Sequence, residues 1–185
     1  MTRRRWWPAA VLAVTCASAA GCASVPVRPA FVGPDGVACV MDGTHVPAQV
    51  AEVANAELLA AALGRTGEGR ICAGQTYRVR APLRIYRVWD GAKQNTYGEW
   101  WALAPPRGDR DDYRRAYAVC PEWNALDRLA ACTLKAGAQI VLGPGQSATC
   151  ADRTYEKSPS TQVFILGRPD QIRSQVEACD LTPWP

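Results

Sequence analysis

Histidine is almost missing from this chain of 185 residues, which holds only His45. The sequence has neither a CxxC pair nor a GxSxG motif. Zinc sites need clustered cysteine and histidine, and serine or cysteine nucleophiles need a nearby base, most often histidine. The sequence therefore argues against a zinc or other metal site, a serine hydrolase triad and a catalytic thiol.

Two further kinds of site are also missing. Residues 143–147 contain glycines but lack the Lys-Ser/Thr ending of a nucleotide-binding P-loop. No pair of carboxylates stands out as the acid and base of a glycosidase. The sequence shows no internal repeat, and after residue 21 it shows no apolar stretch long enough to span a membrane.

Net charge is small once the first residues are set aside. Residues 1–21 contain three arginines and no acidic residue, so the 21 basic residues fall to 18, against 17 acidic residues. A net charge of +1 does not provide the basic surface that nucleic acids attract. We therefore expect no nucleic-acid partner.

Residues 1–21 have the pattern of an export signal. Three arginines at positions 3–5 precede a small, apolar stretch at 9–20. The run Ala19-Ala20-Gly21-Cys22 resembles a bacterial lipobox, with Ala19 in place of the usual leucine. We expect lipidation at Cys22, a tether over residues 22–36 and attachment to a membrane of the cell envelope, on the periplasmic or surface side. The alternative is cleavage by an ordinary signal peptidase near Ala20 or Ala23.

Six cysteines remain after the signal and Cys22 are removed. They are Cys39, Cys72, Cys120, Cys132, Cys150 and Cys179. An even number in an exported chain predicts three disulfides, with fifteen possible connectivities. Some 150 residues are enough for one core, so residues 37–185 are expected to form a single disulfide-stabilised domain.

Hydrophobic periodicity predicts an α+β fold with short mixed or antiparallel strands and flanking helices. Helices are expected at residues 49–63, from Asp109 to about Val119, and at residues 169–178. Strands are expected at residues 71–80, 83–89, 129–135, 139–142 and 162–166.

Residues 84–101 concentrate three tryptophans, two arginines and an Asp-Gly turn. In the predicted strand 83–89, Arg87 shares a face with Leu83, Ile85 and Trp89. A cation in that company is either an edge residue whose stem covers apolar surface or an inward-pointing binding group. The stretch is thus a hairpin that supplies aromatic side chains to the core, or one wall of a ligand cleft.

A series of short motifs follows in order along the chain. It comprises Tyr86-Arg87-Val88-Trp89, Gly98-Glu99-Trp100-Trp101, Pro121 with Asn124, Lys135-Ala136-Gly137, Ser147 and Gln162. This order resembles bacterial toxin domains with an ADP-ribosyltransferase-like fold. The resemblance covers residues 83–166, and it lies in the order and spacing of the motifs.

The resemblance implies a role for each matching residue. Arg87 would bind the pyrophosphate or nicotinamide ribose of NAD, and Trp100 or Trp101 would form an aromatic wall beside the nicotinamide. Ser147 would support the cleft. Gln162 stands where transferases have a catalytic glutamate. Because glutamine cannot act as a base, it would hydrogen-bond the ribose, which suits NAD hydrolysis better than transfer to protein.

The sequence departs from this family in lacking a Ser-Thr-Ser strand and a Glu-x-Glu pair. A non-catalytic envelope lipoprotein that acts as a protein-binding or inhibitor module is the alternative. For the enzyme, Arg87 and Gln162 should lie on adjacent central strands and converge on one pocket. Otherwise, Arg87 should pair with Asp90 or Glu99, and Gln162 should bond the backbone.

Overall fold

The structure is a computed structural model that describes residues 31–41, 46–93 and 95–185. The signal, Cys22, His45 and the first part of the tether lie outside the described residues. Within the described ranges, none of the helices is both long enough and apolar enough to cross a membrane.

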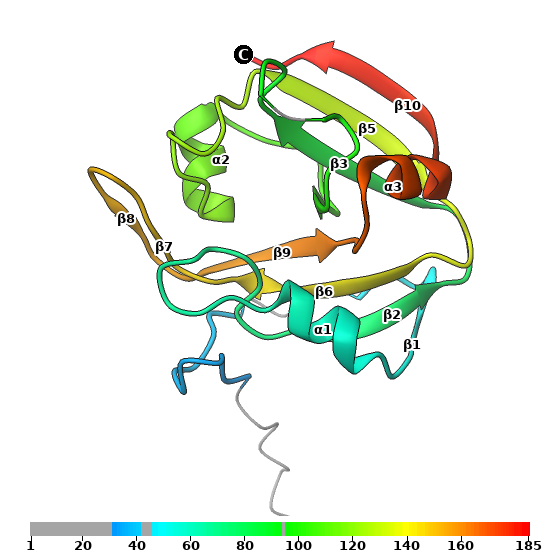
Figure 1. The fold of residues 1–185 in the computed structure, drawn as a ribbon, viewed down its shortest axis with the longest axis horizontal. Coiled ribbons are helices and arrows are strands. Elements are labelled where there is room, and N and C mark those ends of the chain that lie inside the picture. Colours follow the sequence, from blue (N-terminus) through cyan, green and yellow to red (C-terminus); the bar gives the residue numbers. More distant parts are fainter. Residues whose placement is uncertain (1–30, 42–45, 94) are drawn as a thin grey trace, which may run out of the picture.

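One antiparallel sheet organises the domain (Figure 1). Its strand order is β1-β2-β6-β9-β4-β3-β5-β10. The bounds are β1 Val50–Glu52, β2 Gln75–Val79, β3 Leu83–Trp89, β4 Trp100–Ala102, β5 Arg128–Leu134, β6 Gln139–Gly145, β9 Ser158–Phe164 and β10 Val176–Pro183. A separate small hairpin pairs β7 (Ala148–Thr149) with β8 (Thr154–Tyr155), and the helices are α1 (Ala56–Ala62), α2 (Arg110–Tyr117) and α3 (Pro169–Gln175). The α+β class is confirmed.

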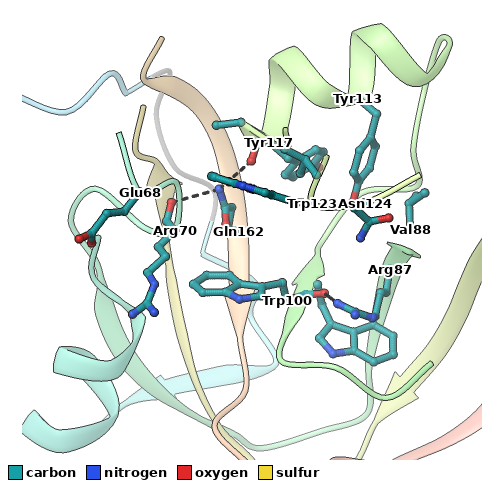
Figure 2. A pocket seen from close by; sticks show the side chains of 13 residues that line it. Glu68, Arg70, Arg87, Val88, Trp100, Tyr113, Tyr117, Trp123, Asn124 and Gln162 are labelled. Atoms are coloured by element: carbon teal, nitrogen blue, oxygen red, sulfur yellow. Dashed lines mark hydrogen bonds between the residues drawn. The ribbon is translucent and has the colours of Figure 1, made fainter. Parts of the chain in front are cut away.

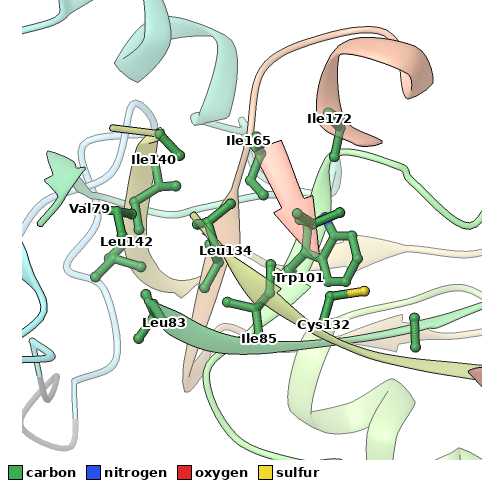
Figure 3. Close-up of a cluster of buried hydrophobic side chains, with 14 of the residues drawn as sticks. Val79, Leu83, Ile85, Trp101, Cys132, Leu134, Ile140, Leu142, Ile165 and Ile172 are labelled. Carbon is green, nitrogen blue, oxygen red and sulfur yellow. The ribbon is translucent and has the colours of Figure 1, made fainter. Parts of the chain in front are cut away.

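The sheet bends so that β2 and β6 face β3 and β5 across the main core (Figure 1). Ile85, Leu134 and Ile140 come from three different strands and Ile165 directly follows β9, and the four side chains meet there with no exposed surface (Figure 3). Ile172 of α3 packs against the same cluster. Burying each such side chain stabilises the fold by about 1.5–3 kcal/mol, so the two halves of the sheet are held together mainly by these contacts.

Several predicted elements are confirmed. Strand β3 has the bounds expected from its alternating pattern. Helix α2 begins after Asp109, whose carboxylate accepts a hydrogen bond from the Asp112 amide while Asp112 bonds back to the Asp109 amide. This reciprocal arrangement satisfies two amides that a helix start leaves without helical partners.

The helix expected at residues 49–63 is wrong in its first part. Residues Val50–Glu52 form β1, which pairs with β2, and Asn55 caps the shorter α1 through a bond from the Leu58 amide. An apolar pattern this short is compatible with helix or strand. Residues 50–52 form a strand because they pair with the distant strand β2.

Two other boundaries differ from expectation. The last helix ends at Gln175, and the chain continues as β10 along β5, so Cys179 belongs to a strand. Strand β6 runs on to Gly145, through a segment expected to be a loop. Gly143 fits there because an added Cβ would lie 2.2 Å from the carbonyl oxygen of Ala73.

The three expected disulfides are confirmed. They join Cys39 to Cys72, Cys120 to Cys150, and Cys132 to Cys179. The last of these fastens β10 to β5, and the second connects the end of α2 to the β7–β8 hairpin.

Candidate functional site

A cavity of about 250 Å³ lies between the C-terminal half of α2 and the strands β3, β4 and β9 (Figure 2). The loop over residues 67–70 and the turn after Cys120 close its sides. Two arginines, Arg70 and Arg87, line it together with several aromatic residues. The sequence-predicted residues Arg87, Trp100, Trp101 and Gln162 are among the lining residues, so the structure brings these four together.

Arg87 supplies a buried positive charge to this cavity. Its side chain is 7% exposed, and Nη1 donates a 2.8 Å hydrogen bond to the carbonyl oxygen of Trp100. Desolvation lowers the pKa of Arg87 to about 10, while the nearby Tyr113 and Glu99 act in the opposite direction. The guanidinium therefore stays protonated at neutral pH in a setting of low polarity, where an anion would be bound strongly.

Gly98 makes room for that guanidinium. A Cβ added to Gly98 would lie 2.3 Å from Nη2 of Arg87 and 2.5 Å from its central carbon. Real Cβ atoms do not approach other atoms so closely, so only glycine lets the backbone of residues 97–99 lie flat against the side chain. Gly98, the first residue of the Gly-Glu-Trp-Trp motif, therefore helps to fix the position of the Arg87 side chain.

Asp90, considered as a partner for Arg87, serves a different purpose. Its carboxylate accepts hydrogen bonds from the amides of Ala92, Lys93 and Ala125. These bonds lower the pKa of Asp90 despite its desolvation. Asp90 thus fixes the turn after β3 and ties it to the segment that precedes β5.

Gln162 joins two walls of the cavity. Its Nε2 donates to the carbonyl oxygen of Arg70 at 3.2 Å and to that of Tyr117 at 3.4 Å (Figure 2). The interpretation in which Gln162 bonds the backbone is confirmed. The expectation of adjacent strands is wrong, because β4 lies between β9, which carries Gln162, and β3, which carries Arg87.

Aromatic side chains form most of the remaining surface. In Figure 2, Trp100 and Trp123 lie on opposite sides of the open space. Trp123 is 41% exposed at the rim, whereas the rings of Tyr113 and Tyr117, both on α2, pack against each other at a tilt with centroids 4.5 Å apart. A planar ligand group would bind well between the rings of Trp100 and Trp123.

Trp101 contributes less to the cavity than Trp100. It is 2% exposed and belongs to the main core, where its Nε1 donates a 2.7 Å bond to the carbonyl oxygen of Gly98. Of the two tryptophans proposed as an aromatic wall, Trp100 is the one whose ring faces the space in Figure 2.

Ser147 lies behind the cavity and not among its lining residues. Its Oγ accepts a bond from the Gly67 amide, and its carbonyl oxygen accepts one from the Gly69 amide. Ser147 therefore supports the loop that carries Glu68 and Arg70 into the lining.

Sequence reasoning missed Glu68, Arg70, Tyr113, Tyr117 and Trp123 as residues of the site. The sequence contained a signal for Glu68 and Arg70, because Gly67 and Gly69 flank Glu68 and indicate an unusual loop backbone. Gly67, Gly69 and Arg70 all have positive φ, with values of 85°, 69° and 68°. Such backbone costs about 1–3 kcal/mol at a residue other than glycine, and it is commonest at functional sites.

One group in the described part of the chain has metal-ligand chemistry. The ligand atoms of Cys120, Glu122 and Cys150 lie within 4.8 Å of one another. The two sulfurs are joined in a disulfide, so neither is a thiolate ligand. The cluster does not fit a metal ion in this oxidised form.

No protein-family model matches the chain, and comparisons with curated proteins and with solved structures find no significant similarity. The resemblance to ADP-ribosyltransferase-like domains therefore stays a prediction.

Proposed function

We propose that the protein is an exported lipoprotein, anchored in the cell envelope through Cys22, whose cavity binds NAD or the nicotinamide part of it. The observation that carries the binding proposal is that the buried guanidinium of Arg87 lines the same cavity as the ring of Trp100. A planar ring with an attached anion is the ligand that suits this pair, because the ring can lie against indole while the anion reaches the cation.

The volume of the cavity limits how much of the ligand it encloses. Small-molecule sites usually measure about 300–1,000 Å³, and this cavity is about 250 Å³. That space suits the nicotinamide ring with its ribose. The adenosine part of NAD would extend past the exposed Trp123 into solvent.

The proposed reaction is hydrolysis of the bond between nicotinamide and ribose. Water adds to the ribose carbon, the carbon–nitrogen bond breaks, and nicotinamide leaves with the bonding electrons. Both Nε2 hydrogens of Gln162 already have carbonyl partners, so only Oε1 is available to accept a bond from a ribose hydroxyl. Glu68 is the carboxylate among the described lining residues, and it would receive the proton of the water.

Binding and turnover should be measured separately on the mature protein. Calorimetry with NAD, nicotinamide mononucleotide and ADP-ribose tests binding, and release of nicotinamide tests turnover. We expect the first two ligands to bind more tightly than ADP-ribose, because they contain the ring. Arg87→Met should abolish binding, whereas Arg84→Met, on the same strand but bonded to Asp180 at the surface, should not. Absence of binding at millimolar NAD would sink the enzyme proposal.

The second candidate is a non-catalytic protein-binding or inhibitor module. Trp123 favours it, because an exposed tryptophan beside a cavity is typical of residues that dominate protein interfaces. If no nucleotide binds, and Trp123→Ala weakens association with a partner isolated from envelope extracts, this candidate replaces the first.

A further inference from the structure

The first described segment, residues 31–41, forms a small hairpin, which we call the N-terminal hairpin. The Val32–Ala38 bridge and the bond from the Cys39 amide to the Phe31 carbonyl oxygen define it. It carries four of the eight large apolar side chains that are exposed in the described part of the chain. They are Phe31, Val32, Val37 and Val40, with exposed fractions of 46%, 51%, 57% and 44%.

The N-terminal hairpin is fastened to the domain. A disulfide joins Cys39 to Cys72, which is fully buried. Asp35 accepts bonds from Thr66 and Gln146, and Lys157 donates to the carbonyl oxygen of Val37. Residues 31–36, assigned above to the tether, are therefore held in place, and so are the exposed apolar side chains.

The N-terminal hairpin offers water almost no charge. Asp35 is its one ionisable residue outside the disulfide. Its carboxylate lies 2.9 Å from Nζ of Lys157, and the two side chains are 11% and 12% exposed. Moving the hairpin into a less polar phase would thus not require removing water from an exposed charge, which is the usual obstacle.

The position of the N-terminal hairpin relative to Cys22 suggests what covers it. Phe31 follows Cys22 by nine residues, which span at most about 30 Å. We propose that the N-terminal hairpin docks onto the lipid surface in which Cys22 is anchored, with the three valines in the headgroup region. This proposal depends on the lipoprotein assignment, and it adds a second attachment that orients the domain on the membrane.

The test uses the full chain in its lipidated form, reconstituted into phosphatidylethanolamine–phosphatidylglycerol vesicles that contain a lipid with a photoreactive acyl chain. After illumination, mass spectrometry maps the lipid adducts. We expect adducts on residues 31–41 and about tenfold fewer in Val32→Ser/Val37→Ser/Val40→Ser. The control Leu181→Ser removes an equally exposed apolar side chain from β10 and should change nothing.

The outcomes separate this proposal from the lipoprotein assignment. If mass spectrometry finds no lipid on Cys22, the assignment fails, and vesicle sedimentation of the same unlipidated chain then decides whether the hairpin binds lipid by itself. If Cys22 is lipidated and residues 31–41 carry no adducts, docking is overturned. Crosslinks from the hairpin to a second copy of the chain would also overturn it. An unchanged melting temperature and an intact Cys39–Cys72 disulfide show that the triple variant is folded.

Discussion

Gln162 and Arg70 are 92 residues apart in the chain, yet Nε2 of the first lies 3.2 Å from the carbonyl oxygen of the second. Arg70 has a φ of 68°, and Ala118, next to the other acceptor Tyr117, has a φ of 51°. One buried amide thus holds two pieces of left-handed backbone on opposite walls of the cavity. In the proposed site Gln162 is a positioning residue first, and only its oxygen is available for a ligand.

Gln162→Glu should therefore destabilise the domain instead of restoring a transferase. An ionised carboxylate cannot donate to the two carbonyl oxygens, and it would be repelled by them. We expect a loss of about 1–3 kcal/mol at neutral pH, measured by urea unfolding.

The loss from Gln162→Glu should shrink as the pH falls. Burial would raise the folded-state pKa of the new carboxyl above its unfolded value, so the protonated form would be the more stable one, and it can donate one bond. Gln49→Glu, at an exposed site, serves as the control. A variant as stable as wild type at pH 7 would contradict the positioning role.

Gly98→Ala should impair ligand binding by moving Arg87. The new methyl group would meet the guanidinium at 2.3 Å, and overpacking of this kind costs about 1–3 kcal/mol. The matched control is Gly91→Ala, whose Cβ would meet only the flexible side chain of Arg128. Thermal unfolding and NAD titration of both variants check the prediction, and equal affinities would count against a role for Arg87.

Removing the disulfide between β5 and β10 should destabilise the whole domain, although this bridge lies outside the cavity. Cys132 and Cys179 are 47 residues apart, and a bridge closing such a loop contributes about 2–4 kcal/mol. Cys132→Ala/Cys179→Ala should lower the free energy of unfolding, measured by urea denaturation, by that amount and leave the other two bridges intact. Peptide mapping of wild type should find none of the six cysteines free.

The N-terminal hairpin should loosen in acid. Bonds from Lys157, the Val37 amide and Thr66 hold the pKa of Asp35 well below its ordinary value. A depressed pKa means that the stabilisation is complete above the unfolded pKa, near 4, and is lost as the pH falls through the folded value. The protection of the Val37 and Cys39 amides against hydrogen exchange, relative to the intrinsic rate at each pH, should decrease below about pH 4. Asp35→Asn should show low protection at every pH, and the same loss of protection in acid in that variant would contradict the assignment to Asp35.

The sequence predicts elements defined by local interactions better than elements defined by contacts between distant segments. Strand β3 and helix α2 were predictable because their signals are local: alternation at residues 83–89 and a capping aspartate at position 109. Strand β1 and the first residues of β10 were mistaken for helix because only pairing with β2 and β5 defines them.

The site was predicted in part for the same reason. Arg87 and Trp100 could be proposed because a cation and aromatic residues are conspicuous within one short stretch. Arg70 and Trp123 come from loops, and only the folded chain brings them to the cavity. The partners of Gln162 are backbone carbonyl groups, which have no sequence signature at all.

The short strand β4 has a consequence for how the wall of the cavity is held together. It contains three residues, and its register with β3 consists of the single pair Tyr86–Ala102, whereas β3 pairs with β5 at seven positions. The sheet therefore has a seam between β4 and β3, next to the cavity. Because the backbone ladder contributes so little there, side-chain contacts hold β4 in place: the bond from Nη1 of Arg87 to the Trp100 carbonyl oxygen crosses the seam, and Trp101 is anchored in the main core. Arg87 is therefore a fastener of the sheet as well as the cation of the cavity, and its loss would loosen the strand that carries the Trp100 ring.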